Sequence, residues 1–178
     1  MQIAITKEMV HSDTRVAINP DTVIKLVKLG YDVVFESNAG RSASFYDDAY
    51  IEAKARSLNL ADIYSTSDIF VKIHTPSTEE LEKIPNGSIL IAMIWPSQNE
   101  DLLTKYAEKN LSVVAMDGIP RISRAQKMDV LSSMSNVSGY RAIIEASSYF
   151  GRFLGGQITA AGKIPPAKIL IIGAGVAG

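Results

Sequence analysis

The chain has 178 residues, of which 47% are hydrophobic, and its 18 basic and 19 acidic side chains give a net charge of -1. This balance excludes the basic field typical of nucleic-acid binding and the charged composition typical of disordered tails. The chain contains no cysteine, which excludes disulfides, thiolate metal sites and a cysteine nucleophile.

The N-terminus is expected to form a first strand and not a signal peptide. Residues 1–13, MQIAITKEMVHSD, lack a basic stretch followed by a long apolar one. The longest apolar runs, 89–96 and 169–178, are too short to span a bilayer. We therefore expect a soluble chain with no membrane span of its own. This expectation does not exclude a membrane-bound partner.

Short apolar runs alternate with amphipathic segments up to Met116, and residues 60–64 have the pattern of a short strand or a turn. This alternation predicts an α/β fold with a doubly wound parallel sheet, of Rossmann or flavodoxin-like type, with helices on both faces. The predicted strands are 3–6, 32–36, 67–73, 88–94 and 111–116. The predicted helices are a segment opened by Asn19-Pro20-Asp21 and ended by Gly30, then 47–55, 78–83 after the Ser77 cap, and 99–109.

The pattern changes after Met116, where residues 117–133 are polar and contain no clear strand. A helical pattern follows from about residue 135 to 154 and ends at Gly155-Gly156, before a proline-containing linker over 159–166. The predicted parts are an N-terminal α/β domain (1–134), a connecting helix (135–156) and the start of a second, NAD-binding Rossmann domain (165–178).

The last ten residues, ILIIGAGVAG, have the pattern of a dinucleotide-binding turn, with a plain tight turn as the alternative. A buried strand is predicted over 168–172, leading into G-x-G-x-x-G. The first glycine makes the turn, the second lets the backbone approach a pyrophosphate, and the third allows a helix to pack on the strand. That helix and the acidic ribose ligand are expected further along, so the site is expected to be incomplete and the apolar strand to promote self-association. The expected cofactor-binding residues here are Gly173, Gly175, Val176, Ala177 and Gly178.

Two other groups of polar residues are candidates for a site. From composition alone, residues 120–133 predict a solvated loop and a capped helix, in which Asp129 pairs with Arg121 or Arg124. Arg15 and Lys72 follow predicted strands, where they would bind a carboxylate or phosphate or lie as surface cations.

No catalytic or metal-binding spacing stands out elsewhere in the chain. His11 and His74 are predicted to be structural or exposed, and Ser132-Ser133 lacks the G-x-S-x-G context of a nucleophile. Neither a histidine pair nor a carboxylate cluster predicts a metal site.

Three stretches resemble the alanine dehydrogenase and pyridine-nucleotide transhydrogenase superfamily. Residues 15–53, RVAINPDTVIKLVKLGYDVVFESNAGRSASFYDDAYIEA, are similar to both branches of the superfamily. Residues 93–99, MIWPSQN, and 119–146, IPRISRAQKMDVLSSMSNVSGYRAIIEA, resemble the transhydrogenase alpha subunit and not alanine dehydrogenase. Lys54 departs from the family's E-A-G-A pattern, and a lysine there is expected to strain a helix end.

The resemblance implies an NAD(H)-binding component of a proton-translocating NAD(P)+ transhydrogenase. Such a component passes a hydride from NADH to NADP+ held on a partner domain, and membrane subunits couple the transfer to proton movement. The resemblance further implies a homodimer that is cytoplasmic and peripheral to the inner membrane. Hydride transfer between two nicotinamides needs positioning of the rings more than an acid, a base or a metal.

The resemblance also implies roles for individual residues. It assigns catalysis to Gln126 and Asp129, and cofactor binding to Arg121, Gln126, Asp129, Ser132 and Ser133. We expect the chain alone to be inactive because its second domain is cut short. The alternatives are an alanine dehydrogenase-like NAD-dependent oxidoreductase, which lacks its general acid-base histidine at residues 93–95, and a non-catalytic folded remnant.

Overall fold

The computed structural model describes residues 1–10 and 12–178. These residues form two compact units, 1–119 and 120–178, and each unit is described by itself. The domain limits expected from the sequence, at residues 134 and 156, stay predictions.

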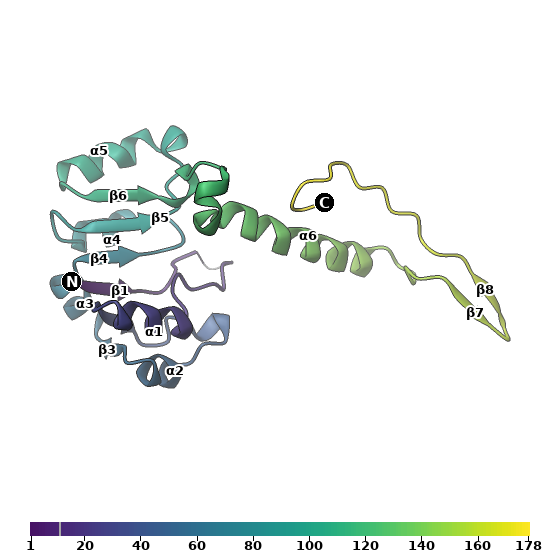
Figure 1. Ribbon diagram of the computed structural model, residues 1–178, viewed down its shortest axis with the longest axis horizontal. Coiled ribbons are helices and arrows are strands. Elements are labelled where there is room, and N and C mark those ends of the chain that lie inside the picture. Colours follow the sequence, from purple (N-terminus) through teal and green to yellow (C-terminus); the bar gives the residue numbers. More distant parts are fainter. Residues whose placement is uncertain (11) are drawn as a thin grey trace. The chain divides into compact units, whose positions relative to one another are not determined.

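The N-terminal unit contains a six-stranded sheet in the order β3-β2-β1-β4-β5-β6 (Figure 1). Every neighbouring pair is parallel, so the predicted α/β class with a parallel sheet is confirmed. The order reverses between β1 and β4, which is the switch point at which doubly wound folds bind ligands. The strands are β1 (Gln2–Ile5), β2 (Asp32–Glu36), β3 (Arg56–Leu58), β4 (Ile69–Val71), β5 (Ile89–Ala92) and β6 (Ser112–Ala115).

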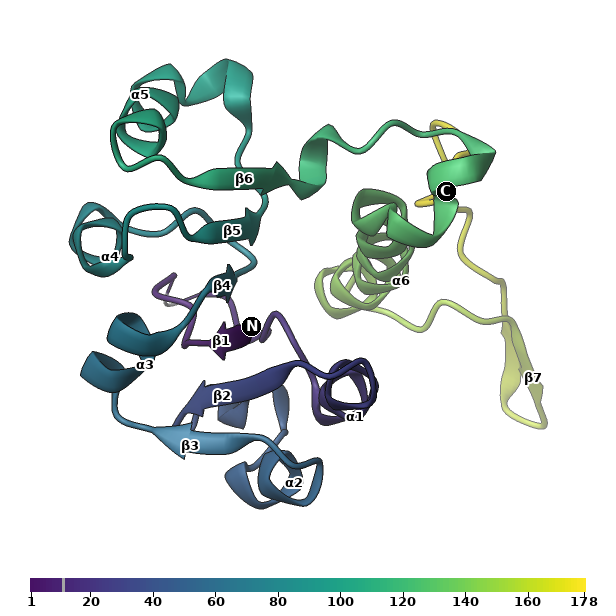
Figure 2. The same cartoon turned by 60° about the vertical axis from the view of Figure 1, so that its left-hand side comes forward.

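Helices cover both faces of this sheet, with α1 and α2 on one side and α3, α4 and α5 on the other (Figure 2). Side chains alternate along β1, so Ile3 and Ile5 pack under the first pair of helices while Ala4 packs under the other three. Their bounds are α1 (Pro20–Lys28), α2 (Asp47–Glu52), α3 (Leu60–Thr66), α4 (Thr78–Lys83) and α5 (Glu100–Glu108), with short 3-10 helices at Arg41–Ala43, Pro96–Gln98 and Met116–Gly118.

One predicted element of the N-terminal unit is wrong and one strand was not predicted. The segment expected to be a strand or turn at residues 60–64 is helix α3, because the Asn59 side chain accepts a hydrogen bond from the Asp62 amide and caps it. The short strand β3 carries only a weak apolar pattern, since it lies at the edge of the sheet and pairs on one side with β2.

The end of α2 confirms the strain expected at Lys54, whose φ is +73°. Lysine seldom adopts this left-handed conformation because its Cβ crowds the following carbonyl.

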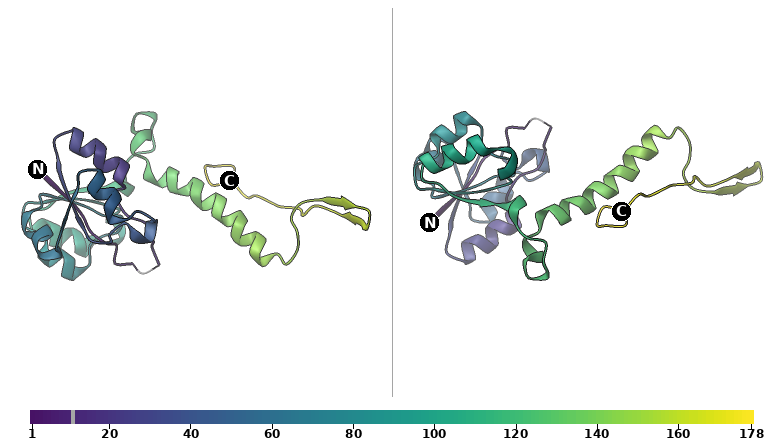
Figure 3. Two further views of the ribbon diagram at one scale, coloured as in Figure 1. Left: turned by 90° about the horizontal axis from the view of Figure 1, so that it is seen from below. Right: turned by 90° about the horizontal axis from the view of Figure 1, so that it is seen from above.

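The second unit, residues 120–178, consists of a 3-10 helix η4 (Ser123–Met128), the helix α6 (Val130–Tyr149) and an antiparallel hairpin of β7 (Gln157–Thr159) and β8 (Gly162–Ile164). Figure 3 shows α6 as one continuous helix that leads into the hairpin. The helix begins earlier than predicted because Asp129 caps it. It also ends earlier than the predicted stop at Gly155-Gly156, because the chain leaves the helix at Gly151, whose φ is +72°.

Two predictions for this unit are wrong. The expected linker at 159–166 contains most of the hairpin, and the expected strand at 168–172 is irregular. A strand forms where a neighbour supplies its hydrogen bonds, and none of the described residues pairs with 168–172. These apolar residues are therefore exposed, with Leu170 85% and Ile172 92% accessible.

Candidate functional site

The predicted nicotinamide-binding segment folds as a capped helix start. The Asp129 carboxylate accepts hydrogen bonds from the Ser132 amide (2.9 Å) and the Ser132 hydroxyl (2.6 Å), and the Ser133 hydroxyl donates to the Asp129 carbonyl (3.3 Å). The two hydrogen bonds from Ser132 hold the pKa of Asp129 below its ordinary value, and the charge of Arg121 acts in the same direction. Asp129, Ser132 and Ser133 are thus brought together at the start of α6, and their role in cofactor binding stays a prediction.

Arg121 and Gln126, which precede this cap in the chain, are both exposed. The ion pair expected between Asp129 and Arg121 or Arg124 does not form, because the carboxylate is taken up by the first turn of α6. Gln126 lies on η4, where its amide can both donate to and accept from a carboxamide. The segment therefore offers hydrogen-bonding groups to a ligand while Asp129 holds the backbone.

The glycine-rich turn lies within the same compact unit as α6, and the C-terminus runs close to this helix (Figure 1). A Cβ added at Gly139 would lie 2.0 Å from the carbonyl oxygen of Ala177, so the end of the turn passes over the helix at this glycine. Gly173 has a φ of +104°, as a tight turn requires. A Cβ added at Gly175 would meet no heavy atom within 4 Å, so the backbone there is open to a ligand.

Lys72 lies at the switch point, but it is buried and fully paired. Its ammonium donates to Glu80 (2.7 Å), to the Lys7 carbonyl (3.0 Å) and to the Thr6 hydroxyl (3.3 Å). An ammonium group has three protons, so no donor is left for a substrate carboxylate. Tyr64, whose pKa is raised by burial and by the nearby carboxylate, also approaches Glu80.

Arg15 is likewise engaged. Its guanidinium donates to Asp13, with Nη2 at 2.5 Å from Oδ2, and the ring of His74 lies 2.7 Å from the same carboxylate oxygen. The hydrogen bonds from Arg15 hold the pKa of Asp13 well below its usual range. Glu8 accepts the amides of Ile73 and His74, at 2.7 and 3.2 Å. At the switch point, each of the two cations is thus paired with a carboxylate of the protein itself. The structure therefore does not support the expected site for a carboxylate or phosphate at Arg15 and Lys72.

Both histidines were expected to be structural or exposed. His74 has the partner just described and is partly buried, whereas His11 lies outside the described residues. Sequence reasoning missed Glu80, although Ser77-x-x-Glu80 is the signature of the capping box that the structure forms.

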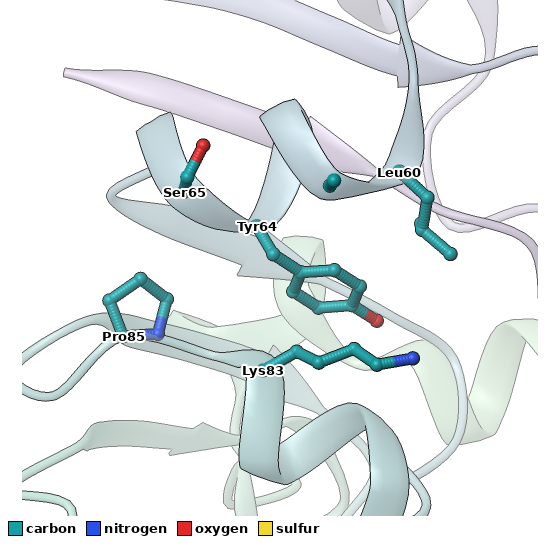
Figure 4. Close-up of a pocket in the computed structure, with 6 residues that line it drawn as sticks. Leu60, Tyr64, Ser65, Lys83 and Pro85 are labelled. Atoms are coloured by element: carbon teal, nitrogen blue, oxygen red, sulfur yellow. The ribbon is translucent and has the colours of Figure 1, made fainter.

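A mainly apolar hollow of about 440 Å³ lies between α3 and α4, on the flank of the sheet (Figure 4). It is lined by Leu60, Ala61, Tyr64 and Ser65 of α3 together with Lys83 and Pro85. It brings together no set of groups that could do acid-base or nucleophilic chemistry.

Among the described residues, no cluster of three or more histidine, aspartate or glutamate side chains could hold a metal ion. Nor does any helix in this part of the chain have the length and apolar character needed to cross a membrane.

A parallel sheet in the strand order of doubly wound folds, followed by a helix and a glycine-rich turn, defines an α/β protein of the Rossmann-like class. Residues 4–138 match the model of the alanine dehydrogenase/PNT N-terminal domain, and residues 142–178 match that of the C-terminal domain. The chain therefore belongs to the alanine dehydrogenase/PNT family.

The relatives refine this assignment. The chain is 51% identical over its whole length to NAD(P) transhydrogenase subunit alpha of Haemophilus influenzae, of which it spans 35%. The crystal structure of transhydrogenase from Sinorhizobium meliloti superposes with a TM-score of 0.96 and 42% identity, covering all of this chain and 53% of that one. Alanine dehydrogenase of Methanococcus maripaludis is 28% identical. The chain thus resembles transhydrogenase subunits more than this alanine dehydrogenase, as residues 119–146 predict, and it spans about a third to a half of these proteins.

Proposed function

We propose that this chain is the NAD(H)-binding component of a proton-translocating NAD(P)+ transhydrogenase. It would pass a hydride from NADH to NADP+ held on a partner subunit, with membrane subunits coupling the transfer to proton movement. The observation that carries the proposal is the 51% identity to a transhydrogenase alpha subunit along the entire chain.

In this proposal the capped segment positions the nicotinamide ring. Exposed Gln126 would hydrogen-bond the carboxamide, and exposed Arg121 would supply a second donor. Asp129 acts through Ser132 and Ser133, because its carboxylate and carbonyl already hold those hydroxyls at the start of α6. Bound nicotinamide supplies the hydride chemistry, and these side chains orient it.

The glycine-rich turn would bind the pyrophosphate. The open backbone at Gly175 fits close approach of a phosphate, and Gly173, Val176, Ala177 and Gly178 complete the turn. A helix N-terminus usually faces the pyrophosphate as well, and residues 173–178 supply the turn that precedes such a helix. NADP(H) would be held on the partner, and the chain would associate with the inner membrane, as a homodimer, through partner subunits.

An alanine dehydrogenase activity is not favoured. Both cations that would hold a substrate carboxylate are engaged with Glu80 and Asp13. The end of β5, where the general acid-base histidine would lie, continues as Met93, Ile94 and Trp95.

The test is NADH binding to the purified chain by calorimetry, followed by a hydride-transfer assay after addition of the NADP(H)-binding partner. The proposal expects measurable binding that Gln126→Ala weakens and Gln157→Ala, at an exposed glutamine in the hairpin, leaves unchanged. Absence of binding by the unsubstituted chain would mean that the family likeness reflects ancestry only, and that the chain is a non-catalytic remnant.

A further inference from the structure

Gly139 lies inside α6, where glycine is unfavourable. The helix runs from Val130 to Tyr149, and glycine loses more chain entropy on entering a helix than any other residue. All residues of α6 are at least partly exposed, so packing into a core does not call for a small residue at this position. The reason for a glycine here lies in a different contact.

That contact comes from the glycine-rich turn, residues 173–178, which belongs to the same compact unit as α6. Outside the neighbouring backbone of the helix, the three atoms closest to a Cβ built at Gly139 all belong to Ala177, and the carbonyl oxygen is the nearest. Gly139 is half-buried, whereas its neighbours Ser138 and Tyr140 are exposed. The missing side chain thus leaves room for one backbone carbonyl, which can accept a weak hydrogen bond from a Cα–H group of Gly139.

The contact sets the direction of the peptide group between Ala177 and Gly178. The carbonyl oxygen of Ala177 is nearer to Gly139 than the carbonyl carbon is, so this carbonyl points toward α6. The peptide bond is trans, and the C=O and N–H groups of a trans peptide point in opposite directions. The Gly178 amide therefore points away from the helix.

A second carbonyl of the turn is also directed inward. A Cβ added at Gly178 would overlap the carbonyl oxygen of Gly173, so this oxygen faces Gly178 and the Ala174 amide points the other way. Within the described part of the chain, neither the Ala174 amide nor the Gly178 amide has a hydrogen-bond acceptor. Backbone N–H groups presented in this way by a turn bind anions such as phosphate.

We propose that Gly139 is a positioning residue for the dinucleotide: by receiving the Ala177 carbonyl, it directs the Gly178 amide toward the pyrophosphate. This inference rests on the proposed function, which supplies the dinucleotide. It adds to the glycine-rich motif a residue that lies far earlier in the chain, on a different element. Gly139 acts through the backbone of the turn and does not itself touch the ligand.

The substitution Gly139→Ala separates this role from helix stability, because the two effects have opposite signs. Alanine favours the helix, whereas its Cβ would overlap a backbone carbonyl, so the turn itself must move. We expect the circular dichroism signal of the helix to stay or rise, while NADH and ADP-ribose both bind roughly tenfold more weakly, as for loss of one hydrogen bond to a charged group. Ser138→Ala, at the exposed neighbouring position, should leave both affinities unchanged.

Amide NMR spectra give a readout that a merely structural role would not move. Sodium pyrophosphate should shift the amide resonances of Ala174 and Gly178 in the unsubstituted chain. The shift at Gly178 should disappear in Gly139→Ala and persist in Ser138→Ala. A Gly178 shift of equal size in Gly139→Ala would overturn the proposal.

Failure of this inference is distinguishable from failure of the proposed function. If Gly139→Ala binds NADH within about twofold of the unsubstituted chain, Gly139 does not position the turn and the proposed function stands. If the unsubstituted chain binds neither NADH nor ADP-ribose, the positioning role and the proposed function both fail.

Discussion

Replacing Lys54 with glycine should stabilise the N-terminal unit. Helices α1, α2 and α5 end in the same way, with a left-handed residue at Gly30, Lys54 and Asn110 respectively. After α2 the amide of Lys54 donates to the Ile51 carbonyl, and the amide of Ala55 donates to the Tyr50 carbonyl, each at 2.9 Å. The other two ends have equivalent pairs of bonds. Glycine and asparagine suit this motif, whereas lysine does not.

The magnitude follows from two opposing contributions. The left-handed conformation costs a residue with a Cβ about 1–2 kcal/mol. Glycine loses about 0.5–1 kcal/mol more chain entropy on folding. The difference predicts a net stabilisation of about 0.5–1 kcal/mol, or a rise in Tm of about 1–4 °C for a chain of this size.

Urea denaturation followed by tryptophan fluorescence measures this effect, because Trp95 lies in the N-terminal unit. Lys54→Gly should raise the midpoint by about 0.3–0.5 M at constant m-value. Lys54→Ala should not raise the urea midpoint, and Gly30→Lys should lower it by an amount similar to the gain from Lys54→Gly. Lys25→Gly, inside α1, should lower stability by about 1 kcal/mol. A lower midpoint for Lys54→Gly would refute the reasoning, because the motif would then tolerate lysine without strain.

Three further predictions concern the core of the N-terminal unit. Lys72→Met should lower the free energy of unfolding, measured by urea denaturation, by about 3 kcal/mol, because it leaves the Glu80 carboxylate without its buried cation. A loss below about 1 kcal/mol would contradict the pairing. The depressed pKa of Asp13 adds stability that is present above the ordinary value of 3.8 and is lost as the pH falls below it. Asp13→Asn should therefore reduce the fall of Tm at acid pH, and an unchanged dependence of Tm on pH would count against the contact. Gly40→Ala should lower the free energy of unfolding by about 1–3 kcal/mol, because the new Cβ would lie 2.6 Å from the Tyr50 hydroxyl. An unchanged thermal midpoint would show that the Tyr50 ring moves aside without cost.

Local patterns in the sequence predict most of the N-terminal fold. The strands β1, β2, β4, β5 and β6 are apolar runs, and the Asn19-Pro20 and Ser77 caps mark the starts of α1 and α4. The sequence pattern fails at 60–64, where a short apolar run suits a strand and a helix equally well and the Asn59 cap decides. It also fails at 168–172, because a strand needs a hydrogen-bonding neighbour that its own residues do not specify.

The candidate site was predictable in part. The sequence places Asp129, Ser132 and Ser133 within one turn, so their mutual contacts are local. The partners of Lys72 and Arg15 are not all local, since Lys72 is held by Thr6 and by the Lys7 carbonyl, more than 60 residues away in the chain. Tertiary contacts therefore decide whether a cation at the end of a strand is free to bind a ligand.

The role of Asp129 illustrates how capping and ligand binding compete for the same groups. A carboxylate that accepts both the amide and the hydroxyl of Ser132 is committed to the start of α6. Its depressed pKa keeps it ionised, so it is a poor proton donor near neutral pH. Asp129 is thus better suited to hold Ser132 and the η4 segment in position than to exchange a proton, which agrees with the proposed hydride transfer, since that step requires no proton.

The exposed segment at residues 168–172 predicts self-association of the chain. Leu170 and Ile172 are 85% and 92% accessible, and adjacent apolar side chains exposed to this degree promote association between copies. Sedimentation velocity over a range of concentrations should show reversible association that the double substitution Leu170→Lys and Ile172→Lys abolishes. Ile158→Lys, at an 80% exposed position on the hairpin, should change it little. If the unsubstituted chain is monomeric at every concentration, the segment is covered in solution by contacts that the structure does not contain.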